Sequence, residues 1–205
     1  MLSTEDRIIM EAGDLFFRHG IRSITMDDIA AQMGISKKTI YQCFKDKDML
    51  VLSFAEKILA RQLEDMNLIR KSSENAIDEI LKTMAHLSKF LQMVNPSFFH
   101  DMRKFHPTSW KLYNRFIDEE LISYIEDNLK RGMKQGLYRK YLKVKILSRM
   151  RLAETNLGFD PEVFPLSQFN FVEVQLTMLE HFLYGILSQK GFQVMEKFPL
   201  IKKDN

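Results

Sequence analysis

The sequence predicts an all-α protein, and three observations lead to that prediction. Long segments carry apolar residues at the 3.6-residue period of a helix, and no segment of convincing length alternates as a β-strand does. Proline and glycine are few, with five and eight in 205 residues. Apolar residues make up 45% of the chain and charged residues 28%, which is ordinary for a folded globular protein. The pattern divides the chain into an N-terminal domain over 1–47 and a second helical domain over 48–205.

The first helix is expected between two local signals. Ser3 and Asp6 form a capping box that satisfies free backbone N–H groups at the helix start, and Gly20 ends the helix. Between these signals one face collects Ile8, Ile9, Ala12, Leu15 and Phe16. Such a face predicts a helix that serves as core beneath the elements that follow.

A second, short helix is expected over 26–33. Thr25 and Asp28 have the spacing of another capping box at its start. Gly34 ends the helix, because glycine accepts the left-handed conformation that a tight turn between helices requires. Ile35 then places an apolar side chain at the corner.

A third helix is expected over 37–44, with Ser36 as its N-cap. Ile40 and Phe44 form its apolar side, and Ala30 of the preceding helix is small enough for the two helices to cross steeply. Two short helices joined in this way form a helix-turn-helix, whose second helix enters the major groove of DNA. The other side chains of this region are the candidate DNA contacts: Thr25, Ser36, Lys37, Lys38, Thr39, Tyr41, Gln42, Lys45 and Lys47.

The charges of this region suit a nucleic-acid partner. From Ser36 to Lys47 there are four lysines and one aspartate, and lysines supply the phosphate contacts that dominate affinity for DNA. Gln42, Thr39 and one or both of the first two lysines are residue types that read base edges. The alternative is a solvated helix with a few lysines, since residues 1–47 hold seven basic and seven acidic side chains. The prediction therefore rests on the turn and on where the lysines fall.

The N-terminal quarter of the chain resembles the DNA-binding domain of TetR-family transcriptional regulators. The resemblance rests on Ile9, Ala12, Phe16, Gly20, Thr25, Ile29, Ala30, Gly34, Ile35, Ser36, Ile40, Tyr41, Phe44, Lys47 and Leu50. It implies a second helical domain that dimerises and binds a small ligand, and it implies phosphate contacts from Tyr41 and Lys47. Cys43 departs from the histidine or tyrosine common in the family, and we expect it to fill a gap beside the first helix.

Further helices are expected from Asp46 to about Arg70, and over 75–94, 108–133, 142–157 and 167–189. The last of these carries two apolar stripes. The first stripe consists of Val172, Leu176, Leu179, Leu183 and Ile186, and the second of Phe171, Val174, Met178 and Phe182. Two stripes need two partners, so we expect the first stripe to form a homodimer interface, completed by Ile146, Met150, Ala153 and Leu157. The alternative is the central core helix of a monomer.

The middle of the chain is the expected ligand site. Sixteen phenylalanines and thirteen methionines are many for this length, and such side chains adapt to irregular apolar ligands. The candidate contacts are Phe98, Met102, Phe105, Trp110 and Phe116. Core packing is the alternative explanation. His86, His100, His106 and Asp101 lack the spacing of metal ligands, so neither a metal nor a cofactor is expected.

A basic stretch from Lys130 to Arg151 holds nine basic residues and no acidic one. It is either a solvated rim or a site that captures an anionic ligand head group or another acidic partner.

Together these features predict a DNA-binding transcriptional regulator, most simply a repressor that an unidentified small molecule releases from a palindromic operator. An accessory protein that positions DNA without a ligand is the alternative. An enzyme is not expected, because no catalytic constellation is visible. The single cysteine excludes an internal disulfide, and the chain shows neither a signal peptide nor a membrane span, which favours the cytoplasm.

Overall fold

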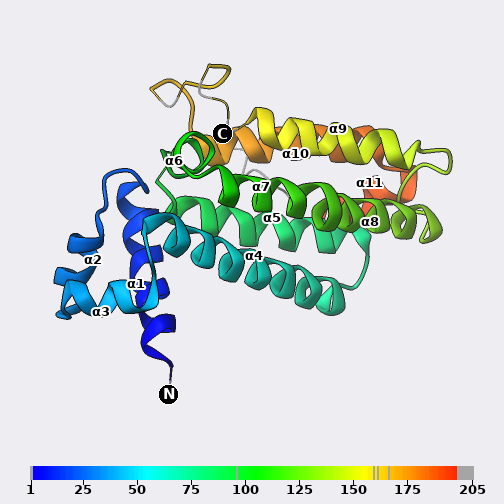
Figure 1. The fold of residues 1–205 in the computed structure, drawn as a ribbon. Coiled ribbons are helices and arrows are strands. Elements are labelled where there is room, and N and C mark those ends of the chain that lie inside the picture. Colours follow the sequence, from blue (N-terminus) through cyan, green and yellow to red (C-terminus); the bar gives the residue numbers. More distant parts are fainter. Residues whose placement is uncertain (1, 96, 159, 161, 166, 198–205) are drawn as a thin grey trace. The chain divides into compact units, whose positions relative to one another are not determined.

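The computed structural model describes residues 2–95, 97–158, 160, 162–165 and 167–197 (Figure 1). Within these ranges the regular elements are helices, apart from an isolated antiparallel bridge between Tyr138 and Leu187. The helices are α1 (Thr4–His19), α2 (Met26–Met33), α3 (Lys37–Cys43), α4 (Lys47–Ser72), α5 (Ala76–Met93), α6 (Ser97–Phe105), α7 (Pro107–Phe116), the π-helical turn η1 (Ile117–Leu121), α8 (Ile122–Lys134), α9 (Val144–Leu157), α10 (Phe171–Ile186) and α11 (Gln189–Met195). The all-α prediction is confirmed. Among these described elements, no helix is both long and apolar enough to cross a membrane.

Residue contacts divide the chain into two compact units that are not contiguous in sequence. Unit 1 comprises Met1–Glu64 and Phe90–Phe116, and unit 2 comprises Asp65–Lys89 and Ile117–Asn205. The long helices α4 and α5 each contribute residues to both units. The functional division after residue 47 remains a prediction.

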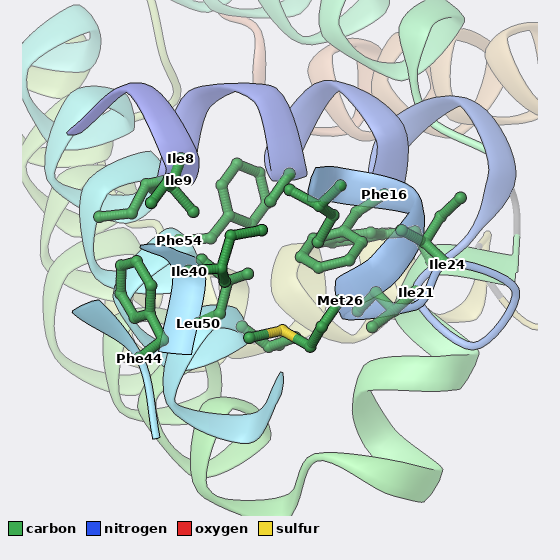
Figure 2. Close-up of a cluster of buried hydrophobic side chains, with 14 of the residues drawn as sticks. Ile8, Ile9, Phe16, Ile21, Ile24, Met26, Ile40, Phe44, Leu50 and Phe54 are labelled. Atoms are coloured by element: carbon green, nitrogen blue, oxygen red, sulfur yellow. The ribbon is translucent and has the colours of Figure 1, made fainter. Parts of the chain in front are cut away.

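The core of unit 1 forms where α1, α2, α3 and the start of α4 meet. Figure 2 shows Ile8, Phe16, Ile40 and Leu50 turned toward one another, and each of these side chains is fully buried. Phe54 of α4 packs edge to face against Phe16, with ring centroids 6.1 Å apart. The apolar face predicted for the first helix therefore does lie in a core.

The segment that contains α6 belongs to unit 1 and is hydrogen-bonded to α1 and to the loop that follows it. The backbone N–H of Asn95 donates to the carbonyl of Phe17 at 2.6 Å, and the backbone N–H of Arg22 donates to Oδ2 of Asp101 at 2.9 Å. A Cβ at Gly20 would lie 2.3 Å from Oγ of Ser97, so this close approach requires glycine. These contacts hold the loop between α1 and α2 in place.

The predicted helix over 108–133 is interrupted. Within it lie α7, η1 and α8 in succession, and the turn at Ile117–Leu121 is π-helical. A π turn takes in one residue more than an α turn, and an inserted residue is not visible in the apolar pattern of a long helix.

In unit 2, α9 packs along α8 and α10. The core of this unit includes Tyr138, whose hydroxyl donates to Oδ1 of Asn128 at 3.0 Å. The predicted helix over 167–189 is observed as α10 over Phe171–Ile186, with Asn170 as its N-cap.

Candidate nucleic-acid interface

The turn between α2 and α3 has the geometry that its sequence predicts. Thr25 Oγ1 accepts a hydrogen bond from the backbone N–H of Asp28 at 3.1 Å, and Asp28 Oδ2 accepts one from the backbone N–H of Thr25 at 2.8 Å. Gly34 follows α2 with φ 64° and ψ 30°, in the left-handed region. A Cβ at Gly34 would meet no atom within 4 Å, so glycine serves the backbone conformation here and not close packing.

The recognition helix α3 begins at a cap and turns one face inward. Oγ of Ser36 accepts from the backbone N–H of Thr39 at 3.1 Å. Ile40 is fully buried against α1 and α4 in the core of unit 1. The helix ends at Cys43, one residue before the predicted end, because Phe44 is extended and turns its ring into the core.

The opposite face of α3 is open to solvent. Among the predicted DNA contacts, seven are exposed: Thr25, Ser36, Lys37, Lys38, Tyr41, Gln42 and Lys45. Thr39 and Lys47 are partly buried. Cys43 is also exposed, so the expectation that it fills a gap beside the first helix is wrong.

The two first lysines of α3 differ in their surroundings. Nζ of Lys37 lies 2.7 Å from a carboxylate oxygen of Asp27 and 5.9 Å from the ring centroid of Tyr41. The hydrogen bond with Asp27 raises the pKa of Lys37. Lys38 has no such carboxylate in the described part of the chain. DNA would therefore compete with Asp27 for Lys37, whereas Lys38 is available directly.

Lys47 lies apart from this exposed face. Its Nζ donates to the carbonyl of Ile21 at 2.6 Å and is partly buried. Burial lowers the pKa of Lys47, and the charges of Asp101, Asp48 and Asp28 partly oppose that shift. The observed contact joins the start of α4 to the loop between α1 and α2. A phosphate contact from Lys47 stays a prediction, and it would require this lysine to leave or share the carbonyl.

The predicted dimer residues fall into two groups. Leu179, Leu183 and Ile186 are buried in the core of their own unit, and Val172 and Leu176 are partly buried. Exposed apolar surface lies instead on α9, at four residues that we call the α9 stripe: Ile146, Met150, Ala153 and Leu157. Three members of the α9 stripe are 42–66% exposed although they are large and apolar. Of the residues predicted for the dimer interface, the exposed apolar ones are thus on α9, and the interface itself remains a prediction.

The predicted ligand residues are also divided. Phe98 and Met102 are buried in the core of unit 1, as the packing alternative anticipates. Trp110 and Phe116 are partly buried, and the Trp110 ring stacks on Tyr113. Phe105 is exposed, with the guanidinium of Arg22 5.2 Å from its ring centroid. No cluster of three or more potential metal ligands occurs among the described residues.

Comparison with known proteins agrees with this arrangement. Residues 8–54 match the family model described as "Bacterial regulatory proteins, tetR family". Over 188 residues the chain is 26% identical to the "Uncharacterized HTH-type transcriptional regulator YvaF" of Bacillus subtilis (strain 168), which covers 91% of this chain and 97% of that protein.

Two solved structures share the fold over most of their length. One is a TetR-family transcriptional regulator from Agrobacterium tumefaciens, with a TM-score of 0.73, 16% identity, and coverage of 90% of this chain and 97% of that chain. The other is a protein from Saccharomonospora viridis solved in complex with choline, with a TM-score of 0.71, 17% identity, and coverage of 90% and 98%. The proteins to which the chain is similar are transcriptional regulators and not enzymes.

Proposed function

We propose that this chain, which belongs to the TetR family of DNA-binding transcriptional regulators, is a dimeric repressor that a small molecule releases from a pseudo-palindromic operator in the cytoplasm. The observation that carries the proposal is the helix-turn-helix itself. The left-handed Gly34 and the Ser36 cap orient α3 so that Ile40 is buried while a polar face remains exposed. A short exposed helix of this kind enters the major groove, where the side chains of its outer face read base edges.

The side chains of α3 divide by chemistry into two roles. Lys38 and Lys45 are exposed cations that suit phosphate oxygens, which position the protein on any duplex. Gln42 is an exposed amide, and an amide pairs bidentately with adenine in the major groove. Tyr41 supplies a hydroxyl that reaches a phosphate. We propose Gln42 as the residue that gives sequence preference.

Dimerisation is proposed through the α9 stripe. One α3 reads only a few base pairs, so strong binding needs two copies, placed on half-sites about 34 Å apart. The α9 stripe offers apolar side chains at helical spacing on one face of α9, which suits packing against the same helix of a second copy. Val172 and Leu176 on α10 are partly buried, and we propose them as further members of this interface.

Release by a small molecule is proposed to act through α6. The hydrogen bonds of Asp101 and Asn95 tie this region to α1 and to the loop before α2. A ligand whose binding shifts α6, wherever that ligand binds, therefore also shifts the support of the helix-turn-helix in unit 1. A coupling of about 1–3 kcal/mol would weaken operator binding roughly 5- to 150-fold, and operator DNA would weaken ligand binding equally. The choline complex from Saccharomonospora viridis supports a small-molecule partner for this fold.

The test is selection of duplexes from a random pool, followed by anisotropy titrations with the selected site and with unrelated DNA. We expect a two-fold symmetric site. Gln42→Ala should cost about 1–3 kcal/mol on the selected site and much less on unrelated DNA. The matched control is Gln32→Ala, which changes an exposed glutamine of α2. Equal losses on both duplexes would remove Gln42 from base reading, and selection of no symmetric site would contradict the dimeric repressor. If no small molecule alters operator binding, the ligand-free accessory protein becomes the better description.

A further inference from the structure

One cation of the basic stretch is buried inside unit 2. Eight of its nine basic residues are exposed or partly buried, whereas Arg151 of α9 is 7% exposed. Ser148 and Leu152 lie on the same inward side of α9 and are buried as well. Burial of a guanidinium is costly unless acceptors surround it, because the charge loses its hydration. The neighbours of Arg151 therefore decide how far its charge is compensated.

The acceptors around Arg151 are few and weak. Its Nη2 donates to the thioether Sδ of Met84 at 4.0 Å. Its Nη1 has no hydrogen-bond partner among the described residues and lies 3.5 Å from Oε2 of Glu154, as an ion pair. The ring of Phe182 lies with its centroid 5.9 Å from the guanidinium carbon. Arginine carries five N–H donors, and these contacts leave it short of oxygen acceptors.

A second polar side chain on the facing helix is also incompletely bonded. Gln175 of α10 is 1% exposed, and its Nε2 donates to the carbonyl of Thr155 at 2.9 Å. Its Oε1 has no hydrogen-bond partner within the described residues. Thr155 lies one turn from Arg151 along α9, and its hydroxyl donates to the Arg151 carbonyl. The region between α9 and α10 therefore holds a donor group and an acceptor that both lack a full set of partners.

The charge of Arg151 persists despite its surroundings. Burial lowers the pKa of Arg151, and Glu154 opposes that shift. Arginine nevertheless stays protonated in proteins, because its ordinary pKa is so far above neutrality. Nearly all buried polar groups are hydrogen-bonded in native proteins, so an exception calls for an explanation such as a partner that binds there.

We propose that Arg151 binds the carboxylate of an amphipathic effector that has an apolar body. A carboxylate matches the planar fork of a guanidinium with two parallel hydrogen bonds. Met84 and Phe182 supply apolar contact, and the flexible Met84 side chain can move aside as the head group takes its place. The proposal rests on the proposed function of a ligand-released repressor. It places the effector in unit 2 and not among Phe98 and Met102 of unit 1.

The experiment compares three probes that share a ten-carbon chain: decanoate, 1-decanol and decyltrimethylammonium. Binding to the full chain is measured by calorimetry, with wild type and Arg151→Met. Methionine keeps an unbranched side chain but removes one partner of the ion pair with Glu154, so the folding of this variant is checked by circular dichroism before the calorimetry. Arg149→Met is the matched control, since Arg149 is exposed on the same helix. We expect decanoate to bind more tightly than the other probes, and Arg151→Met to weaken decanoate binding roughly 10- to 100-fold while Arg149→Met does not.

Three results would overturn the proposal: no binding of decanoate, equal binding of decanoate and 1-decanol, or unchanged decanoate binding by Arg151→Met. Should Arg151→Met fail to fold, Arg151→Lys replaces it, because lysine keeps the charge and loses the bidentate fork. The comparison of the three probes on wild type tests the proposal without either variant.

An operator-release assay, run in parallel, separates the failure of this proposal from the failure of ligand release. If decanoate binds through Arg151 without weakening operator binding, the result contradicts ligand release but still supports Arg151 as a carboxylate-binding site. A compound that releases DNA equally from wild type and Arg151→Met would support ligand release and contradict Arg151 as the effector site.

Discussion

Asp101 tests how α6 supports the loop that precedes the helix-turn-helix. Its side chain is 6% exposed, and Oδ2 accepts the backbone N–H of Arg22 at 2.9 Å across 79 residues of sequence. Its charge also acts on Lys47, where it opposes the effect of burial on the pKa. A hydrogen bond to a charged acceptor contributes about 1.5–3 kcal/mol, so Asp101→Ala should lower the free energy of unfolding by about that amount.

The measurement is urea denaturation followed by circular dichroism. Asp101→Asn should lose less than Asp101→Ala, because the amide keeps a neutral acceptor oxygen. The matched control is Asp14→Ala, an exposed aspartate on α1 that should change stability by no more than about 0.5 kcal/mol. If Asp101→Ala and Asp14→Ala give the same small change, the contact does not hold α6 to the loop. The route proposed for ligand release would then lose its support.

Three further outcomes are expected. Gly34→Ala should destabilise the protein by about 1–2 kcal/mol in urea denaturation, because φ is 64° and the surrounding space is open, so that backbone strain acts alone. Hydrogen bonds from Thr25 lower the pKa of Asp28 below 3.8, so their contribution to stability is present above that pH and is lost as the pH falls through the folded pKa. The free energy of unfolding of Thr25→Val should therefore fall less than that of wild type as the pH is lowered through the pKa of Asp28, measured by urea denaturation at a series of pH values. Ile146→Arg should give monomers in sedimentation while remaining folded, since Ile146 is 66% exposed, whereas Leu183→Arg should unfold the chain, since Leu183 is fully buried. Folded monomers from Leu183→Arg would contradict this assignment.

The helices α1, α2 and α3 were predictable because the sequence signals that start and end them are local. The capping boxes at Ser3 and Thr25 each span four residues, and the conformation of Gly34 follows from a turn of similar length. Such signals need no knowledge of the rest of the chain. The bond between Arg22 and Asp101 is different, because nothing near either residue indicates a partner so distant in sequence. The same holds for the contact of Lys47 with the carbonyl of Ile21.

The C-terminal helices show a second limit of prediction from sequence, which concerns the partner that each apolar face of a helix packs against. Periodicity identified the apolar stripe that includes Leu179 and Leu183, but a stripe suits a subunit partner and an internal core equally well. The structure assigns these two leucines to the core of unit 2 and leaves the α9 stripe exposed. The choice depends on which helices pack together, and that information is spread over the whole sequence.

Arg151 shows how a local charge pattern can hide one exceptional member. A run of nine cations without an acid is typical of a solvated face, and eight of the nine have side chains that reach solvent. Helical phase separates the ninth, because Arg151 stands three residues after Ser148 and four after Leu147, on the side of α9 that faces the core. Arg149, two positions earlier, points outward. A cation placed in phase with core residues must find acceptors inside the protein or in a ligand, and within the described residues Nη1 of Arg151 has only the ion pair with Glu154. Charge, helical phase and unmet hydrogen bonds coincide at this arginine, although each of the three alone is common.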